Sequence, residues 1–130
     1  VAAVDRFLEV AKFSNGGLNP NGGKIDIAAP GVDTYSSAPD PAPPRQPPFF
    51  RPWSGRYDAI SGTSMATPHV AGVAALIKQA KPNATPEDVR RELIESARDL
   101  SLPNRDVGAG LVQAPRVAPP DGTASIRVIG

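Results

Sequence analysis

The residues most able to do chemistry are the small, hydroxylated ones at positions 61–64, Ser-Gly-Thr-Ser, just before a long apolar run. From Met65 onward Ala, Val, Leu and Ile dominate and no charged residue occurs until Lys78, which predicts a buried helix. Residues 57–60, bounded by glycines, predict a strand that ends in a turn. Ser64 would then stand at a strand-to-helix junction. Its hydroxyl could attack a carbonyl, and a free backbone N–H could hold the resulting oxyanion.

The same hydroxyl groups also have a simpler structural role available. Ser61, Thr63 or Ser64 could serve only as the N-cap of the predicted helix, because a side-chain oxygen there accepts a bond from a free N–H group. The types of these small residues, taken alone, favour such a cap. A longer pattern is needed before a nucleophile becomes the better interpretation.

Residues 62–72 supply that pattern: Gly-Thr-Ser-Met-Ala-Thr-Pro-His-Val-Ala-Gly. This string closely resembles the nucleophile motif of the subtilisin-like serine proteases, the subtilases, over eleven consecutive positions. The resemblance implies that Ser64 is the catalytic nucleophile and that its N–H is one oxyanion donor. It also implies that Gly62, Thr63 and Met65 support the oxyanion site and the motif.

Other stretches resemble the same family in the same order. Val1 to Asp5 matches a family strand, Phe13-Ser14 precedes a turn, and Asp26 to Gly31 matches an Asp-x-x-Ala-Pro-Gly strand. Residues 108–114 resemble the closing Gly-x-Gly segment, which returns against the core. The similarity therefore covers about residues 1–114.

The remaining members of a catalytic triad are missing from this chain. Its one histidine, His69, comes five residues after Ser64 on the same predicted helix and is poorly placed to take the Ser64 proton. In subtilases the matching histidine is structural. The catalytic histidine, the catalytic aspartate and the oxyanion-hole asparagine all lie in upstream segments. Pro68 is expected in the first helical turn, where a missing N–H costs little.

The isolated chain is therefore predicted to be inactive as a protease. Loss of the base from such a triad costs about six orders of magnitude in turnover, and the measured case is itself a subtilisin. The resemblance implies that the intact protein is a serine endopeptidase acting through an acyl-enzyme at Ser64. Its partners would be a peptide or protein substrate and the upstream segment of the same protease. A secreted or extracellular location follows from the resemblance.

The fold class implied is α/β: a subtilisin-like three-layer αβα sandwich with a mostly parallel sheet, of which this chain supplies only the C-terminal part. Residues 1–114 would belong to the catalytic domain, 115–122 would be a linker, and 123–130 would begin a possible C-terminal extension. Because upstream strands would be absent, the sheet is expected to leave an unpaired edge.

Local patterns predict further elements. Val1 to Val4 suits a buried strand, and residues 24–28 alternate as a strand does. Thr85 and Pro86 are typical of an N-cap and first helical position. Four residues of that helix fall on one apolar face, namely Val89, Leu93, Ile94 and Ala97.

Residues 39–53 form a proline-rich stretch. We expect neither a helix nor an inner strand there, because half of residues 39–52 lack an amide hydrogen. A surface loop inserted in the fold is the simplest interpretation. The loop could instead border the substrate cleft, with Phe49, Phe50 and Trp53 along its wall. A different class of function uses this loop, 39–52, as the contact of a non-catalytic binding module. A third possibility is a purely structural domain.

Composition excludes several other classes. With 14 basic and 13 acidic residues the formal net charge is +1, so no electrostatic case for nucleic acid or a membrane surface exists. No apolar run reaches membrane-spanning length, and cysteine is absent. No cofactor is evident, although calcium is possible in the intact enzyme. Asp5, Asp26 and Asp33 are single acids, expected to be surface charges and not metal ligands.

Overall fold

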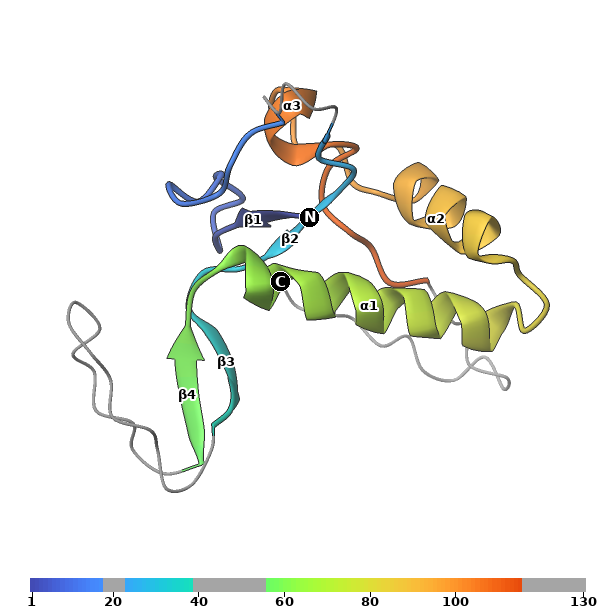
Figure 1. Ribbon diagram of the computed structural model, residues 1–130, viewed down its shortest axis with the longest axis horizontal. Helices are drawn as coiled ribbons and strands as arrows, with labels where there is room; N and C mark the ends of the chain where they lie inside the picture. The colour runs from blue at the N-terminus through green and yellow to red at the C-terminus, as the bar shows by residue number, and fades with distance from the viewer. Residues whose placement is uncertain (18–22, 39–55, 116–130) are drawn as a thin grey trace, which may run out of the picture.

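The computed structural model describes residues 1–17, 23–38 and 56–115 of the chain. The elements, in order, are β1 (Ala2–Val4), β2 (Ala28–Pro30), β3 (Thr34–Ser37), β4 (Tyr57–Ile60), α1 (Thr63–Ala80), α2 (Pro86–Glu95) and α3 (Asn104–Val107). β1 and β2 form a parallel pair, whereas β3 and β4 form a separate antiparallel ribbon. Figure 1 shows this ribbon projecting from the N-terminal end of α1, whose first half passes close to β1 and β2.

The centre of the fold is the β1–β2 pair, in which Ala2 lies opposite Ala28. All three residues of β1 are fully buried. The end of the described chain completes this centre: the Ala28 N–H donates to the Gly110 carbonyl (2.8 Å), and the Val112 N–H donates to the Ala28 carbonyl (2.9 Å). Residues 108–114 therefore return against the core, as the sequence predicts.

The outer edge of β1 is already occupied by the chain itself. Ala2 and Val4 bond toward β2, so Ala3 faces the other way. The Ala3 N–H donates to Ser14 Oγ (3.1 Å), and the Ala3 carbonyl accepts the Ala11 N–H (2.9 Å). The prediction of an unpaired edge is wrong at this position, because the chain folds back after β1 and satisfies both groups locally.

The strand predicted at 24–28 is displaced toward the C-terminus. It begins at Ala28, and its entry from Ile27 is buried, as is typical of a parallel strand. Asp26 lies outside it, because its carbonyl accepts the Ala109 N–H (2.9 Å) and its side chain pairs with Arg90 on α2. β3 and the short α3 have no counterpart among the elements expected from the sequence.

Helix α1 has the extent expected from the sequence, but its burial differs. It ends at Ala80, and Lys78 Nζ closes the following turn by donating to the carbonyls of Pro82 (2.7 Å) and Ala84 (2.8 Å). Only Ala66 and Ile77 are buried along it. The prediction of a buried helix is therefore wrong for the described residues, which cover one side of α1 only. No helix in the described ranges is both long and apolar enough to cross a membrane.

Helix α2 begins at the predicted cap. The Thr85 hydroxyl accepts the Asp88 N–H (3.2 Å), and the Asp88 carboxylate accepts the Thr85 N–H (2.9 Å), which is a complete capping box. Of the predicted apolar face, Val89 and Leu93 are buried in the core and Ile94 is half-buried. Ala97 is half-buried against the core but lies beyond the end of α2 at Glu95, so the helix is shorter than the predicted face. The predicted proline-rich loop at 39–53 and residues 116–130 of the predicted linker and extension lie outside the described residues.

Candidate active site

The site around Ser64 is a sharp junction between β4 and α1. The N-cap of α1 is Gly62, which has no side chain to donate or accept. The alternative role of Ser61, Thr63 or Ser64 as a helix cap is therefore wrong. Ser61 Oγ instead accepts the N–H of Asp33 (2.9 Å), a link between the two strands of the ribbon. Ser64 itself is exposed in the first turn of the helix.

The junction is tied to the central sheet through Gly31. The Gly62 N–H donates to the Gly31 carbonyl (2.8 Å), and the Gly31 N–H donates to the Val4 carbonyl (3.0 Å). A Cβ on Gly31 would lie 2.6 Å from the Cβ of Ala3 and 2.9 Å from the Gly62 carbonyl oxygen. Only glycine lets β2 and the start of α1 approach so closely, and Ser64 is positioned two residues after this contact.

The backbone around Ser64 is arranged as at an open helix start. The N–H groups of Met65 (2.9 Å) and Ala66 (3.3 Å) both donate to the Gly62 carbonyl. In the part of the chain that the structure describes, no hydrogen bond uses the Ser64 N–H or the Ser64 hydroxyl. The first turn of α1 contains no acidic residue. The positive end of the helix dipole is therefore not neutralised beside the hydroxyl.

Pro68 lies in the second turn of α1, one turn later than the sequence predicts, because the helix begins at Thr63. Its missing N–H leaves the Ser64 carbonyl without the usual helical donor. The neighbouring carbonyls each receive an additional side-chain contact. Thr67 Oγ1 donates to the Thr63 carbonyl (2.9 Å), and His69 Nδ1 bonds the Met65 carbonyl (2.9 Å).

His69 is exposed, and its ring does not bond Ser64 in the described part of the chain. Since the Met65 carbonyl can only accept, Nδ1 carries the proton in this contact. This geometry agrees with a structural part for His69 and gives Ser64 no base.

The three single aspartates have separate surroundings. Asp5 Oδ1 accepts two N–H groups of its own turn, from Phe7 (2.8 Å) and Glu9 (3.0 Å). Asp26 pairs with Arg90 at 3.0 Å, and Asp33 is exposed. Within residues 1–17, 23–38 and 56–115, no group of three or more potential metal ligands lies together. The three aspartates therefore do not form a calcium site together.

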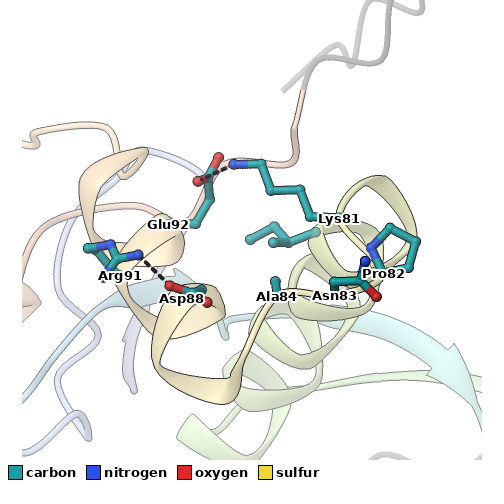
Figure 2. Close-up of a pocket in the computed structure, with 8 residues that line it drawn as sticks. Lys81, Pro82, Asn83, Ala84, Asp88, Arg91 and Glu92 are labelled. Carbon is teal, nitrogen blue, oxygen red and sulfur yellow. Dashed lines mark hydrogen bonds and ion pairs between the residues drawn. The ribbon is translucent and has the colours of Figure 1, made fainter.

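A cavity of about 390 Å³ lies between the end of α1 and the start of α2, and Figure 2 shows its lining. Two ion pairs border it: Lys81 with Glu92 (2.7 Å) and Arg91 with Asp88. Ile77, which also lines it, is roughly 20 Å along α1 from Ser64. The charges of this cavity neutralise one another, and it is separate from the candidate active site.

Comparison with known proteins adds the family. A sequence profile described as "Subtilase family" matches residues 1–110. The thermostable alkaline protease of Halalkalibacterium halodurans is 41% identical over 117 residues, which is 89% of this chain and 27% of that protein. Subtilisin Savinase of Lederbergia lenta is 38% identical over 114 residues, 88% of this chain and 35% of that protein. A protease structure from Pseudoalteromonas arctica aligns with a TM-score of 0.64 and 38% identity, covering 87% of this chain and 32% of that one.

These matches define an α/β protein of the subtilisin type. The chain belongs to the subtilase family, and the predicted fold class is confirmed. It spans about a quarter to a third of the length of the two curated relatives named above. The anchoring roles of Gly31 and Ser61 are not among the expectations from the sequence. The Ala-Pro-Gly string pointed to the first, whereas the second depends on a contact with Asp33 that sequence alone does not reveal.

Proposed function

We propose that the protein to which this chain belongs is a serine endopeptidase and that Ser64 is its nucleophile. The observation that supports this most directly is the exposed Ser64, in the first turn of α1, tied to the central sheet through Gly62 and Gly31. Family membership supports the reaction type. Extracellular action is part of the same proposal and rests on the likeness to subtilisins.

In this proposal the Ser64 hydroxyl attacks the scissile carbonyl and forms an acyl-enzyme, which water then hydrolyses. The Ser64 N–H and the positive end of the α1 dipole, which no acidic residue of the first turn neutralises, stabilise the oxyanion. Gly62 leaves room for the substrate backbone, while Thr63 and Met65 flank the nucleophile. The chain's own residues supply the attacking group and one oxyanion donor. A histidine and an aspartate from an upstream segment supply the base and the group that orients it.

The upstream segment is also proposed to be the partner that covers α1. Several small or apolar residues of α1 are exposed along one side, namely Ala71, Gly72, Ala75 and Leu76. A Cβ on Gly72 would meet nothing within 4 Å, and Leu76 is 41% exposed. Such an apolar side is unusual for a helix face that is exposed to solvent. The relatives are about two and a half to three times as long as this chain, so a longer protein of this family has the length to cover it.

Labelling with a fluorophosphonate, read by intact mass, tests the proposal. In the intact protease we expect one adduct per chain, lost in Ser64→Ala and kept in Ser96→Ala, a matched exposed serine. The isolated 130-residue chain should give no adduct, because it lacks the base. An unlabelled intact protease would contradict the assignment of Ser64. An adduct on the isolated chain that disappears in Ser64→Ala would show that some base reaches Ser64 without the upstream segment.

A further inference from the structure

Two exposed tyrosines stack across the ribbon that leads into Ser64. Tyr35 on β3 and Tyr57 on β4 have ring centroids 5.7 Å apart, with planes at 17°. They are 72% and 55% exposed, so the described chain does not bury them against its core. They are diagonal neighbours on one face, because Tyr35 lies opposite Ala59 and Tyr57 lies opposite Ser37.

A continuous ladder joins this pair to the nucleophile. Beyond the tyrosines, the four residue pairs of β3 and β4 end at Thr34 opposite Ile60. The Asp33–Ser61 bond follows, and then the bond from the Gly62 N–H to Gly31. A one-residue slip of β4 against β3 would move the chain by about 3.4 Å and exchange its two faces. The start of α1 would move with it.

Hydrogen bonds hold the register at the two ends of the ribbon: Asp33 to Ser61 at the end next to Ser64, and the Ala38 N–H to the Arg56 carbonyl (2.6 Å) at the other. Between these ends, the tyrosine stack is a side-chain contact that depends on the register. A two-residue turn normally specifies the register of a hairpin, but here the strands are connected through residues 38–56. Ser36 and Ser37 are exposed polar residues that would tolerate either face. On the opposite face Thr34 Oγ1 is buried without a hydrogen-bond partner among the described residues, so it does not favour the observed register.

We infer that Tyr35 and Tyr57 are positioning residues for Ser64: their stacking, together with the bonds at the two ends of the ribbon, fixes the register of the strands that lead to Ser64 at the start of α1. The inference rests on the proposed function of Ser64, but its effect on the ribbon can be measured independently. Aromatic stacking favours one arrangement over another by about two- to tenfold. The tyrosines touch no substrate in this scheme and act only through the backbone.

The first measurement is the rate of fluorophosphonate labelling of the intact protease. Tyr35→Ala with Tyr57→Ala should lower this rate, by up to about tenfold, because Ser64 is correctly placed in a smaller fraction of molecules. Tyr35→Phe with Tyr57→Phe keeps the stacked rings and should restore the rate. Phe7→Ala is a matched control, since Phe7 is also aromatic and 69% exposed but lies in another turn.

The second measurement is amide hydrogen exchange in the same variants, which does not require activity. Removal of the stack should speed exchange at Gly62 and Asp33 by about two- to tenfold. The Val112 and Val89 amides, which bond elsewhere in the fold, should be unchanged and so exclude general unfolding. Unchanged exchange at Gly62 and Asp33 in the alanine variant would overturn the inference. The inference would also be overturned if exchange at Gly62 and Asp33 became equally fast in the phenylalanine variant, because the effect would then belong to the hydroxyl groups.

The two measurements separate the inference from the proposed function. If the wild-type intact protease is not labelled, the nucleophile assignment fails, and exchange at Gly62 still decides whether the tyrosines fix the ribbon. If the wild type is labelled and the alanine variant is labelled equally fast, the positioning role is wrong and Ser64 stands.

Discussion

Ser64 and Asp88 both lie in the first turn of a helix, and their surroundings differ in charge and hydrogen bonding. At α1 no side chain caps the helix and no acid lies in the first turn. At α2 a capping box and two acids, Glu87 and Asp88, occupy the equivalent position. The positive end of α2 is therefore neutralised by the protein itself, whereas that of α1 remains available to a negative charge formed during reaction.

Asp88 gives the chain a predictable acid sensitivity. The Thr85 hydroxyl, then the Thr85 N–H and then Arg91 lower the pKa of Asp88 from 3.8 to about 2. A lowered folded-state pKa contributes stability above the unfolded value, and this contribution is lost as the pH falls from about 4 toward 2. We expect the urea midpoint of the wild type to exceed that of Asp88→Asn at pH 6. The difference should disappear near pH 2, and a constant difference would contradict the assignment.

At the scale of elements, the contact between the end of β2 and the start of α1 decides where the nucleophile lies. We predict that Gly31→Ala destabilises the chain by about 1–3 kcal/mol, because the new methyl group would overlap Ala3 and the Gly62 carbonyl. Labelling of Ser64 in the intact protease should fall as α1 shifts. Chemical denaturation measures the first effect and fluorophosphonate kinetics the second.

Gly72→Ala is the matched control for that substitution. It adds the same methyl group in the middle of α1, where nothing lies within 4 Å. In the isolated chain it should stabilise by up to about 1 kcal/mol, through helix propensity alone. A comparable loss of stability in both variants would show that the close approach at Gly31 is not the cause.

The elements that the sequence predicts well are those defined by local signals. Thr85 and Pro86 mark the start of α2, and the charge at Lys78 marks the end of the apolar run of α1. The boundaries of β2 depend on a partner, since Ala28 bonds to residues near Leu111. The burial of α1 was predicted wrongly because an apolar run indicates which helix can be buried, whereas burial itself depends on which elements pack against each side.

In the candidate site, too, features set by adjacent residues are predictable from the sequence, and features set by distant partners are not. Ser64 is identifiable from a string of eleven adjacent residues, so the sequence predicts it directly. β3 was missed because Thr34–Ser37 is short and mostly polar and pairs with a strand that begins twenty residues after its own end. The contacts that position Ser64, through Gly31 and Ser61, join segments about thirty residues apart and become visible only in the fold.

For the whole molecule, adjacent residues of α1 should respond in opposite ways to substitution. Leu76 is 41% exposed and Ile77 is 2% exposed. In the isolated chain, Leu76→Glu should change the free energy of unfolding by no more than about 0.5 kcal/mol. Ile77→Ala should cost about 2–5 kcal/mol through lost burial. Urea titration of both variants provides the comparison.

The same pair tests the proposed partner of the open side of α1. When the chain is combined with its upstream segment, Leu76→Glu should prevent recovery of labelling at Ser64, because a carboxylate would be buried without a partner. If labelling were recovered as well as in the wild type, the upstream segment would have to dock elsewhere.

The bonds from Ala28 to Gly110 and Val112 have a consequence for synthesis. A ribosome produces Ala28 more than eighty residues before the segment that completes its pairing. The central strands must therefore wait, partly unpaired, until the polypeptide has emerged past Val112. Contacts of such sequence separation slow folding, and the exposed intermediate is prone to aggregate. A nascent chain that stalls before Val112 would lack the last central partner of Ala28.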